Sequence, residues 1–183
     1  MTNRGLPFRA RNESDVESLD LEAISRRLAA VTAGPWVLVE SGSERYILLG
    51  AQTEPRPLYV RRELEQAGRE DVAFIAHMPE DVGFLLSVLE SGTVSESDVP
   101  RISEIEVRVE AATPGPWWDW LESSGALGGS SMISVLSDEF APDIYLWHGD
   151  RIASDSDIEF VAHGRQDVPL LLAAVRSLLR TSA

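Results

Sequence analysis

The sequence predicts an α+β protein made of two tandem α-β-β-β-α repeats, packed as a pseudo-twofold-symmetric unit with antiparallel sheets. Two observations carry this prediction. The motif Thr-x-Gly-Pro-Trp occurs at residues 32–36 and returns at 113–117. A longer stretch at 71–86 returns at 157–172, with Asp, Phe, His and Leu at matching places. Self-similarity of this kind is the sequence signature of a repeated structural unit.

Each unit is predicted to begin with an amphipathic helix. In the first copy the apolar spacing that marks one helical face is seen at Leu21, Ile24, Leu28 and Val31. The second copy has the same spacing at Ile102, Ile105, Val109 and Ala112. Residues 105–109 alone alternate like a strand, and the better-patterned first copy decides for a helix.

Three short strands follow in each unit. In the first copy they span 36–40, 46–49 and 58–60, with 41–45 as the first loop. Their counterparts span 117–121, 132–135 and 144–146, with a longer Ser- and Gly-rich loop at 122–131. Helices would cover one face of such a small sheet, and we expect the sister unit to cover the other.

The last helix of each unit is predicted to begin near Asp81 or Asp167, with that aspartate as its N-cap. Asp71 and Asp157 precede short apolar segments and have the same capping interpretation. The histidine at 77 or 163 would then lie in the bend between two successive helices.

The repeat defines the predicted domain organisation. Residues 1–17 are expected to be a flexible N-terminus. The first unit spans 18–91, an exposed linker with Gly, Ser and Pro spans 92–101, and the second unit spans 102–183.

Composition limits the possible functions. The 183 residues include no cysteine, which excludes disulfides, thiolate metal sites and cysteine nucleophiles. The net charge of −14 disfavours direct nucleic-acid binding and suits a basic protein partner, although acidity also serves solubility. With neither an apolar leader nor an apolar run long enough for a bilayer, we expect a cytoplasmic location and no membrane partner.

The Gly-Pro-Trp part of the motif has a structural interpretation. The glycine is expected to take the positive φ that ends a helix, the proline to stop it, and the tryptophan to close the core at that corner. A binding role for the tryptophans is the alternative. The residues concerned are Gly34, Pro35, Trp36, Gly115, Pro116 and Trp117.

The repeated aspartates have two interpretations. As caps they need no ligand, and Asp71 and Asp81 are then purely structural. A ligand site in the second copy would instead use the second-copy residues Asp157, His163, Arg165 and Asp167. A metal would need a further ligand, so we expect no metal and no cofactor. Known nucleophile and phosphate-loop motifs are absent, and we expect no enzymatic activity.

Three tryptophans occur only in the second copy. Trp118 and Trp120 face one side of their strand, whereas Trp117 faces the other. With Trp147 and nearby acids such as Asp119, an exposed pair could bind a partner. Burial between the two units is the competing explanation.

At these motifs the chain resembles small proteins of actinobacteria and their phages, loosely grouped with Ea22-like phage proteins. Those proteins carry Thr-Pro-Gly-Pro-Trp and a later Asp-x-x-Phe-Ile-Ala-x-Ala-Arg-x-Asp-Val-Pro-x-Leu-Leu. The second copy matches well at 113–117 and 157–172, whereas the first has Ala33, Pro79 and Gly83 at departing positions. The resemblance implies a phage or prophage accessory setting and no established catalytic activity.

The predicted function is therefore a non-enzymatic, acidic interaction protein, of phage accessory or inhibitor type, which acts on a protein partner and can associate with itself. The alternative is a small-ligand or nucleotide-binding protein, with its site around His163, Arg165 and Asp167 in the second repeat.

Overall fold

The computed structural model describes residues 19–50, 56–62, 65–122, 131–135 and 142–181, and within them the fold is α+β with four helices and an antiparallel sheet. This confirms the predicted class. The predicted flexible N-terminus at 1–17 and most of the loop at 122–131 lie outside the described residues.

The strands form one continuous sheet in the order β1-β2-β3-β7-β6-β5. Two further short strands extend it, because β4 pairs with β3 and β8 pairs with β7. Every pairing is antiparallel. The strands are β1 (Trp36–Ser41), β2 (Glu44–Leu49), β3 (Arg56–Arg62), β4 (Glu65–Gln66), β5 (Trp117–Trp120), β6 (Met132–Val135), β7 (Ile144–His148) and β8 (Arg151–Ile152).

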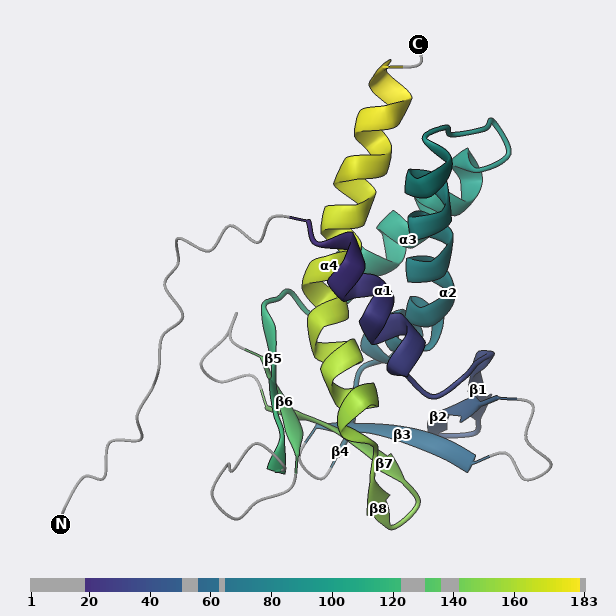
Figure 1. The fold of residues 1–183 in the computed structure, drawn as a ribbon. Coiled ribbons are helices and arrows are strands. Elements are labelled where there is room, and N and C mark those ends of the chain that lie inside the picture. Colours follow the sequence, from purple (N-terminus) through teal and green to yellow (C-terminus); the bar gives the residue numbers. More distant parts are fainter. Residues whose placement is uncertain (1–18, 51–55, 63–64, 123–130, 136–141, 182–183) are drawn as a thin grey trace, which may run out of the picture.

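The helices lie together on one side of this sheet (Figure 1). They are α1 (Leu21–Ala30), α2 (Arg69–Ser91), α3 (Val99–Ala111) and α4 (Asp155–Thr181). The two long helices α2 and α4 contact each other and the strands, and the short helices α1 and α3 pack against them. The core lies between the long helices and the sheet.

Strand residues alternate between the core and the opposite face, as a period of two requires. In β2, Ile47 and Leu49 are buried while Tyr46 and Leu48 are half-buried. The predicted loop at 41–45 is shorter than expected, since Ser41 and Glu44 are paired. Gly42 takes a φ of 62° in the resulting two-residue turn, a conformation that favours glycine.

The expected role of the motif glycines is wrong. The first and third helices end earlier, at cap residues Val31 and Ala112, whose backbone is extended and whose N–H groups bond carbonyls one turn back. Gly34 and Gly115 are not among the positive-φ glycines, and each precedes its proline through a cis peptide bond. Trp36 and Trp117 are buried in the core as predicted.

The capping interpretation of the aspartates is also wrong. Helix α2 begins at Arg69, after the N-cap Gly68, and continues through Asp81. Helix α4 begins at Asp155 and continues through Asp167. Both aspartates therefore lie in the middle of a helix, where they are buried and form ion pairs with another helix.

The two halves do not cover each other's sheet faces as expected. Strand β3 instead pairs with β7, edge to edge, from Leu58 opposite His148 to Arg62 opposite Ile144. This pairing bonds backbone N–H and C=O groups that would otherwise stay unpaired at two sheet edges. As a consequence, the sheet face opposite the helices runs without interruption across both halves.

Helix α2 is the one helix of the described part that is long and apolar enough to cross a membrane, judged by length and composition. More than half of its apolar stretch is buried inside the fold, and it contains the buried carboxyl groups of Asp71 and Asp81. These features are those of a core helix and are compatible with a soluble protein.

Candidate functional site

Two of the repeated aspartates bind threonines from the opposite half of the chain. The Asp157 carboxylate accepts hydrogen bonds from Thr32 N and Oγ1, both at 2.8 Å. The Asp71 carboxylate accepts from Thr113 N at 2.7 Å and Oγ1 at 2.9 Å, and Arg62 donates to it at 2.9 Å. Both carboxylates are buried and occupied by these contacts.

The other two repeated aspartates form ion pairs between helices. Asp81 in α2 accepts from Arg108 in α3 at 2.8 and 2.9 Å, and Asp167 in α4 accepts from Arg27 in α1 at 2.6 Å. Burial raises the pKa of the Asp81 carboxyl above its ordinary range, and Arg108 opposes this rise. These aspartates therefore hold the short helices against the long ones.

Arg165 is likewise engaged inside the fold. Its guanidinium donates to Thr113 O at 2.8 Å and Val109 O at 3.1 Å, and it lies 5.4 Å from the ring centre of Phe74. The two carbonyls belong to the end of α3 and the residues after it, where helix carbonyls lack partners of their own. Gly115 gives the side chain room, since a Cβ there would meet Arg165 Cγ at 3.0 Å.

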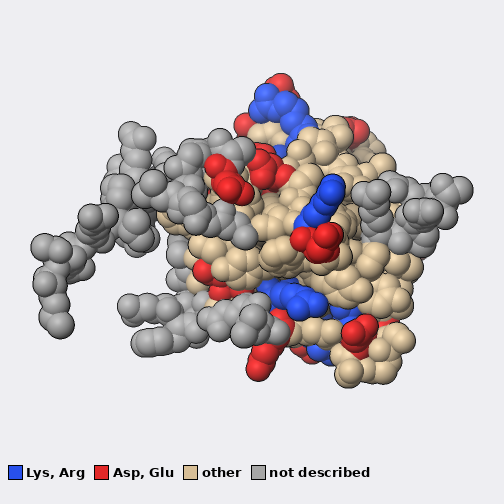
Figure 2. Space-filling model, turned by 90° about the horizontal axis from the view of Figure 1, so that it is seen from below, with Lys and Arg blue, Asp and Glu red and all other residues tan. Residues whose placement is uncertain are grey.

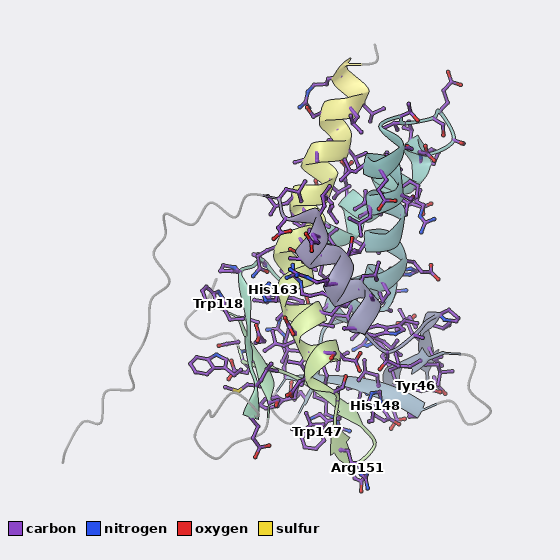
Figure 3. The ribbon with its side chains drawn as sticks, in the orientation of Figure 1. Tyr46, Trp118, Trp147, His148, Arg151 and His163 are labelled. Carbon is purple, nitrogen blue, oxygen red and sulfur yellow. The ribbon has the colours of Figure 1, made fainter. Side chains whose placement is uncertain are left out.

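The histidines have few contacts. His163 Nε2 lies 3.7 Å from Asp119 Oδ1, beside β5, whereas His77 is exposed. His148 lies at the end of β7, where its Nδ1 is buried without a hydrogen-bond partner among the described residues. Figure 3 shows His163 on α4 next to β5, and His148 with Tyr46, Trp147 and Arg151 at the strand end of the molecule. The residues predicted for a ligand site therefore do not converge on one open space.

A cleft of about 390 Å³ lies at the turn between β7 and β8. Its lining residues are Pro57, His148, Gly149, Asp150 and Arg151. The cleft is open to solvent and holds one histidine and two charged side chains, but none of the predicted site residues.

The most distinctive surface is the sheet face opposite the helices, which we call the outer face. Successive side chains of a strand point to opposite sides of the sheet. Residues paired across strands with a buried residue therefore lie on the core side, and the residues next to them in the same strand lie on the outer face. The large apolar side chains of the outer face are Val37, Val39, Tyr46, Leu48, Pro57, Tyr59, Trp118, Trp120, Met132, Tyr145 and Trp147, and its larger polar ones include Glu44, Arg61 and Gln66.

Burial follows this alternation in β5. Trp117 is 1% exposed and packs edge-on against Phe74 in the core, with ring centres 6.0 Å apart. Trp120 is 48% exposed and Trp118 is half-buried. Because β5 is at the far end of the sheet from β1, β2 and β3, these two tryptophans do not lie between the halves.

Aromatic side chains also occupy the middle of the outer face. Tyr59 of β3 lies opposite Trp147 of β7, and its ring centre is 5.8 Å from that of Tyr46 in β2. The hydroxyl of Tyr145 donates to Met132 Sδ at 3.4 Å on the next strand. Figure 2, seen from below the sheet, shows a largely uncharged surface in which charged side chains form small, separate groups.

Sequence reasoning found the second-copy part of this surface and missed the rest. It identified the tryptophans at 118, 120 and 147 but not Tyr46, Tyr59 or Tyr145. The signal was present, because each tyrosine alternates with buried aliphatic residues along its strand. What the sequence did not reveal was the edge pairing of β3 with β7, which joins the two aromatic sets into one surface.

No cluster of metal-ligating side chains occurs among the residues that the structure describes. Comparisons of the chain with protein-family models, curated proteins and solved structures gave no match.

Proposed function

We propose that this chain is a non-enzymatic interaction protein that binds another protein through its outer face. The observation that carries the proposal is the composition of that face. An antiparallel sheet with one face in water ordinarily alternates apolar residues toward the core with polar residues toward solvent. Here most side chains away from the core in β1, β2, β3, β5 and β7 are aromatic or aliphatic, and Glu44 and Arg61 are charged exceptions. Extended apolar surfaces of this kind mark interaction sites.

The residue types on this face favour a protein partner. Trp, Tyr and Arg are the types enriched at the energetic centres of protein interfaces. Tyr59 and Trp147 form a cross-strand pair near the middle, and Trp120 adds a half-exposed ring at one end. These rings offer large, rigid contact areas at a low cost in side-chain entropy.

The net charge of −14 favours the same class of partner. A field of this sign repels nucleic-acid backbones and accelerates the approach of proteins with basic surroundings to their contact site. The phage accessory or inhibitor setting implied by the motif resemblance is consistent with such a role and remains an expectation.

The alternative ligand site in the second half receives less support. Arg165 and Asp167 already bond Thr113, Val109 and Arg27, so an anionic ligand would have to displace these internal contacts. The cleft at the turn between β7 and β8 includes none of His163, Arg165 and Asp167.

We also propose that the chain is a tandem duplication with pseudo-twofold symmetry. Residues matched by the repeated motifs make matching contacts across the halves. The first-half Thr32 and Arg27 contact Asp157 and Asp167, while the second-half Thr113 and Arg108 contact Asp71 and Asp81. The rings pair in the same crossed way, as Trp36 with Phe160 and Trp117 with Phe74.

The test measures the affinity of a purified partner, identified by affinity capture, for outer-face variants in calorimetric titrations. Trp120→Ala and Trp147→Ala should each weaken binding by about 1–3 kcal/mol, as expected for an aromatic anchor. Val107→Ala is the matched control, since Val107 is 65% exposed on α3, away from the sheet. Unchanged affinity in both tryptophan variants, with weaker binding in the control, would place the interaction elsewhere and refute the proposal.

A further inference from the structure

One basic side chain stands among the aromatic residues of the outer face, where Glu44 is the acidic one, at the turn between β1 and β2. Arg61 of β3 lies opposite Tyr145 of β7 on one side and Gln66 of β4 on the other. Its guanidinium carbon is 5.7 Å from the ring centre of Tyr59, and the side chain is exposed. It therefore lies on the strand that joins the two halves of the sheet, next to the Tyr59 and Trp147 pair.

The Arg61 side chain lacks the polar contacts that several other arginines of the sheet and helices make. Arg27, Arg62 and Arg108 donate to aspartates, and Arg165 donates to backbone carbonyls. Within the described ranges, the Arg61 side chain makes no hydrogen bond or ion pair, and its guanidinium lies against the Tyr59 ring. A guanidinium has donors arranged in a fork that matches a carboxylate, and here that fork is available to a partner.

We propose that the outer face takes a peptide segment of its partner that places one carboxylate on Arg61 and apolar or aromatic side chains on the surrounding rings. This inference rests on the proposed function and specifies the chemistry of the partner. The neighbouring rings would exclude water from the ion pair, and charge-assisted hydrogen bonds are stronger where water is excluded. The aromatic neighbours Tyr59, Tyr145 and Trp147 supply the apolar part of the contact.

A single carboxylate fits the electrostatics better than the other candidates. A nucleic acid would bring many phosphates toward a chain of net charge −14 with one cation at the contact. A second copy of this chain would bring a further charge of −14, so two like-charged chains would repel each other. A segment with one acidic side chain, flanked by apolar residues and with basic residues further out, is complementary to both charges. Its carboxylate pairs with Arg61, and its basic residues are attracted by the net negative charge of the chain.

The experiment selects a randomised linear peptide library, displayed on phage, on the immobilised full chain. Peptides enriched on the parent protein should carry Asp or Glu beside aromatic or aliphatic residues. Arg61→Gln should lower the affinity of a synthetic peptide from this set by about tenfold or more. Arg61→Glu should shift the selected charge from acidic to basic. Arg26→Gln is the matched control, because Arg26 is an exposed arginine on α1, and it should leave the selection unchanged.

The outcomes separate this inference from the proposed function. Peptides that require Trp147 but show no preference for acidic residues overturn the carboxylate assignment and leave the outer face as a binding surface. Failure to select any peptide that depends on Trp147 or Trp120 overturns both. Arg61→Gln and the parent should have matching unfolding midpoints, so a lost preference reports recognition rather than folding. Self-association through the outer face, or binding of a single-stranded oligonucleotide that depends on Arg61, would likewise overturn the peptide assignment.

Discussion

The crossing of α2 and α4 gives the sharpest stability prediction. A Cβ added at Gly164 in α4 would lie 2.0 Å from Met78 Sδ and 2.9 Å from its Cε. Met78 is fully buried, so its thioether has no free space to move into. Overpacking a core typically costs about 1–3 kcal/mol. Alanine gains about 1 kcal/mol over glycine within a helix. At so short an approach we expect the clash to exceed this gain, with a net loss of up to about 2 kcal/mol for Gly164→Ala.

The assay is urea unfolding, with a double-mutant cycle to identify the cause. In a Met78→Ala background the obstruction is gone, so Gly164→Ala should be neutral or stabilising by up to about 1 kcal/mol. Gly83→Ala in α2 is the control, because its added Cβ would meet Leu28 Cδ2 at an ordinary 3.8 Å. If Gly164→Ala proves as stable as Gly83→Ala, the close contact does not exist in solution and the reasoning fails.

Three further predictions concern the contacts between helices. Asp157→Ala should lower the unfolding free energy by about 1–3 kcal/mol in urea titrations, since it leaves Thr32 without its buried acceptor; a loss below that of exposed Asp150→Ala would contradict this. Burial raises the pKa of the Asp81 carboxyl, so the folded state binds its proton more tightly than the unfolded state. Protonation of Asp81 therefore stabilises the fold fully below the unfolded-state pKa, and this stabilisation is lost as pH rises through the folded-state pKa. Carbon-detected NMR titration should therefore find the Asp81 midpoint above 3.8, and the stability of the parent relative to Asp81→Asn should increase as pH falls from neutral. Arg165→Ala should cost about 1–3 kcal/mol by leaving the carbonyls of Thr113 and Val109 unpaired, with a thermal midpoint equal to that of the parent as the refuting result.

The spacing of apolar residues predicted strands and helices well where burial of one side of the element is the only cause of the pattern. The strand at 132–135 matches β6 at both ends, and 46–49 falls within β2, because buried and outer residues alternate there without exception. The amphipathic spacing found α1 and α3, although each helix begins or ends a few residues from the expected place. Periodicity reports which side of an element is buried, and both predictions depended on that alone.

The aspartates show where such reasoning stops. An aspartate shortly before an apolar run is a common pattern of a helix start, yet α2 runs through Pro79 and Asp81 to Ser91. What distinguishes a cap from a mid-helix ion pair is the partner, and Arg108 lies on a different helix. The outer face has the same difficulty, since its tyrosines and tryptophans become one surface only through the pairing of β3 with β7. Local sequence does not specify which strand edges meet.

The crossed contacts between the halves also set the order in which the chain can fold during synthesis. Arg27 cannot pair with Asp167 until 140 further residues have been synthesised, and Thr32 cannot bond Asp157 until 125 further residues have been synthesised. At ribosomal rates of about 5–20 residues per second, α1 spends roughly 6–30 s without α4, one of the two long helices against which it packs. The edge of β3 is unpaired for much of the same interval, because β7 is made long after it. A nascent first half therefore presents an apolar helix side and a free strand edge together, and chaperone binding during translation would protect the chain most while residues 92–157 are being made.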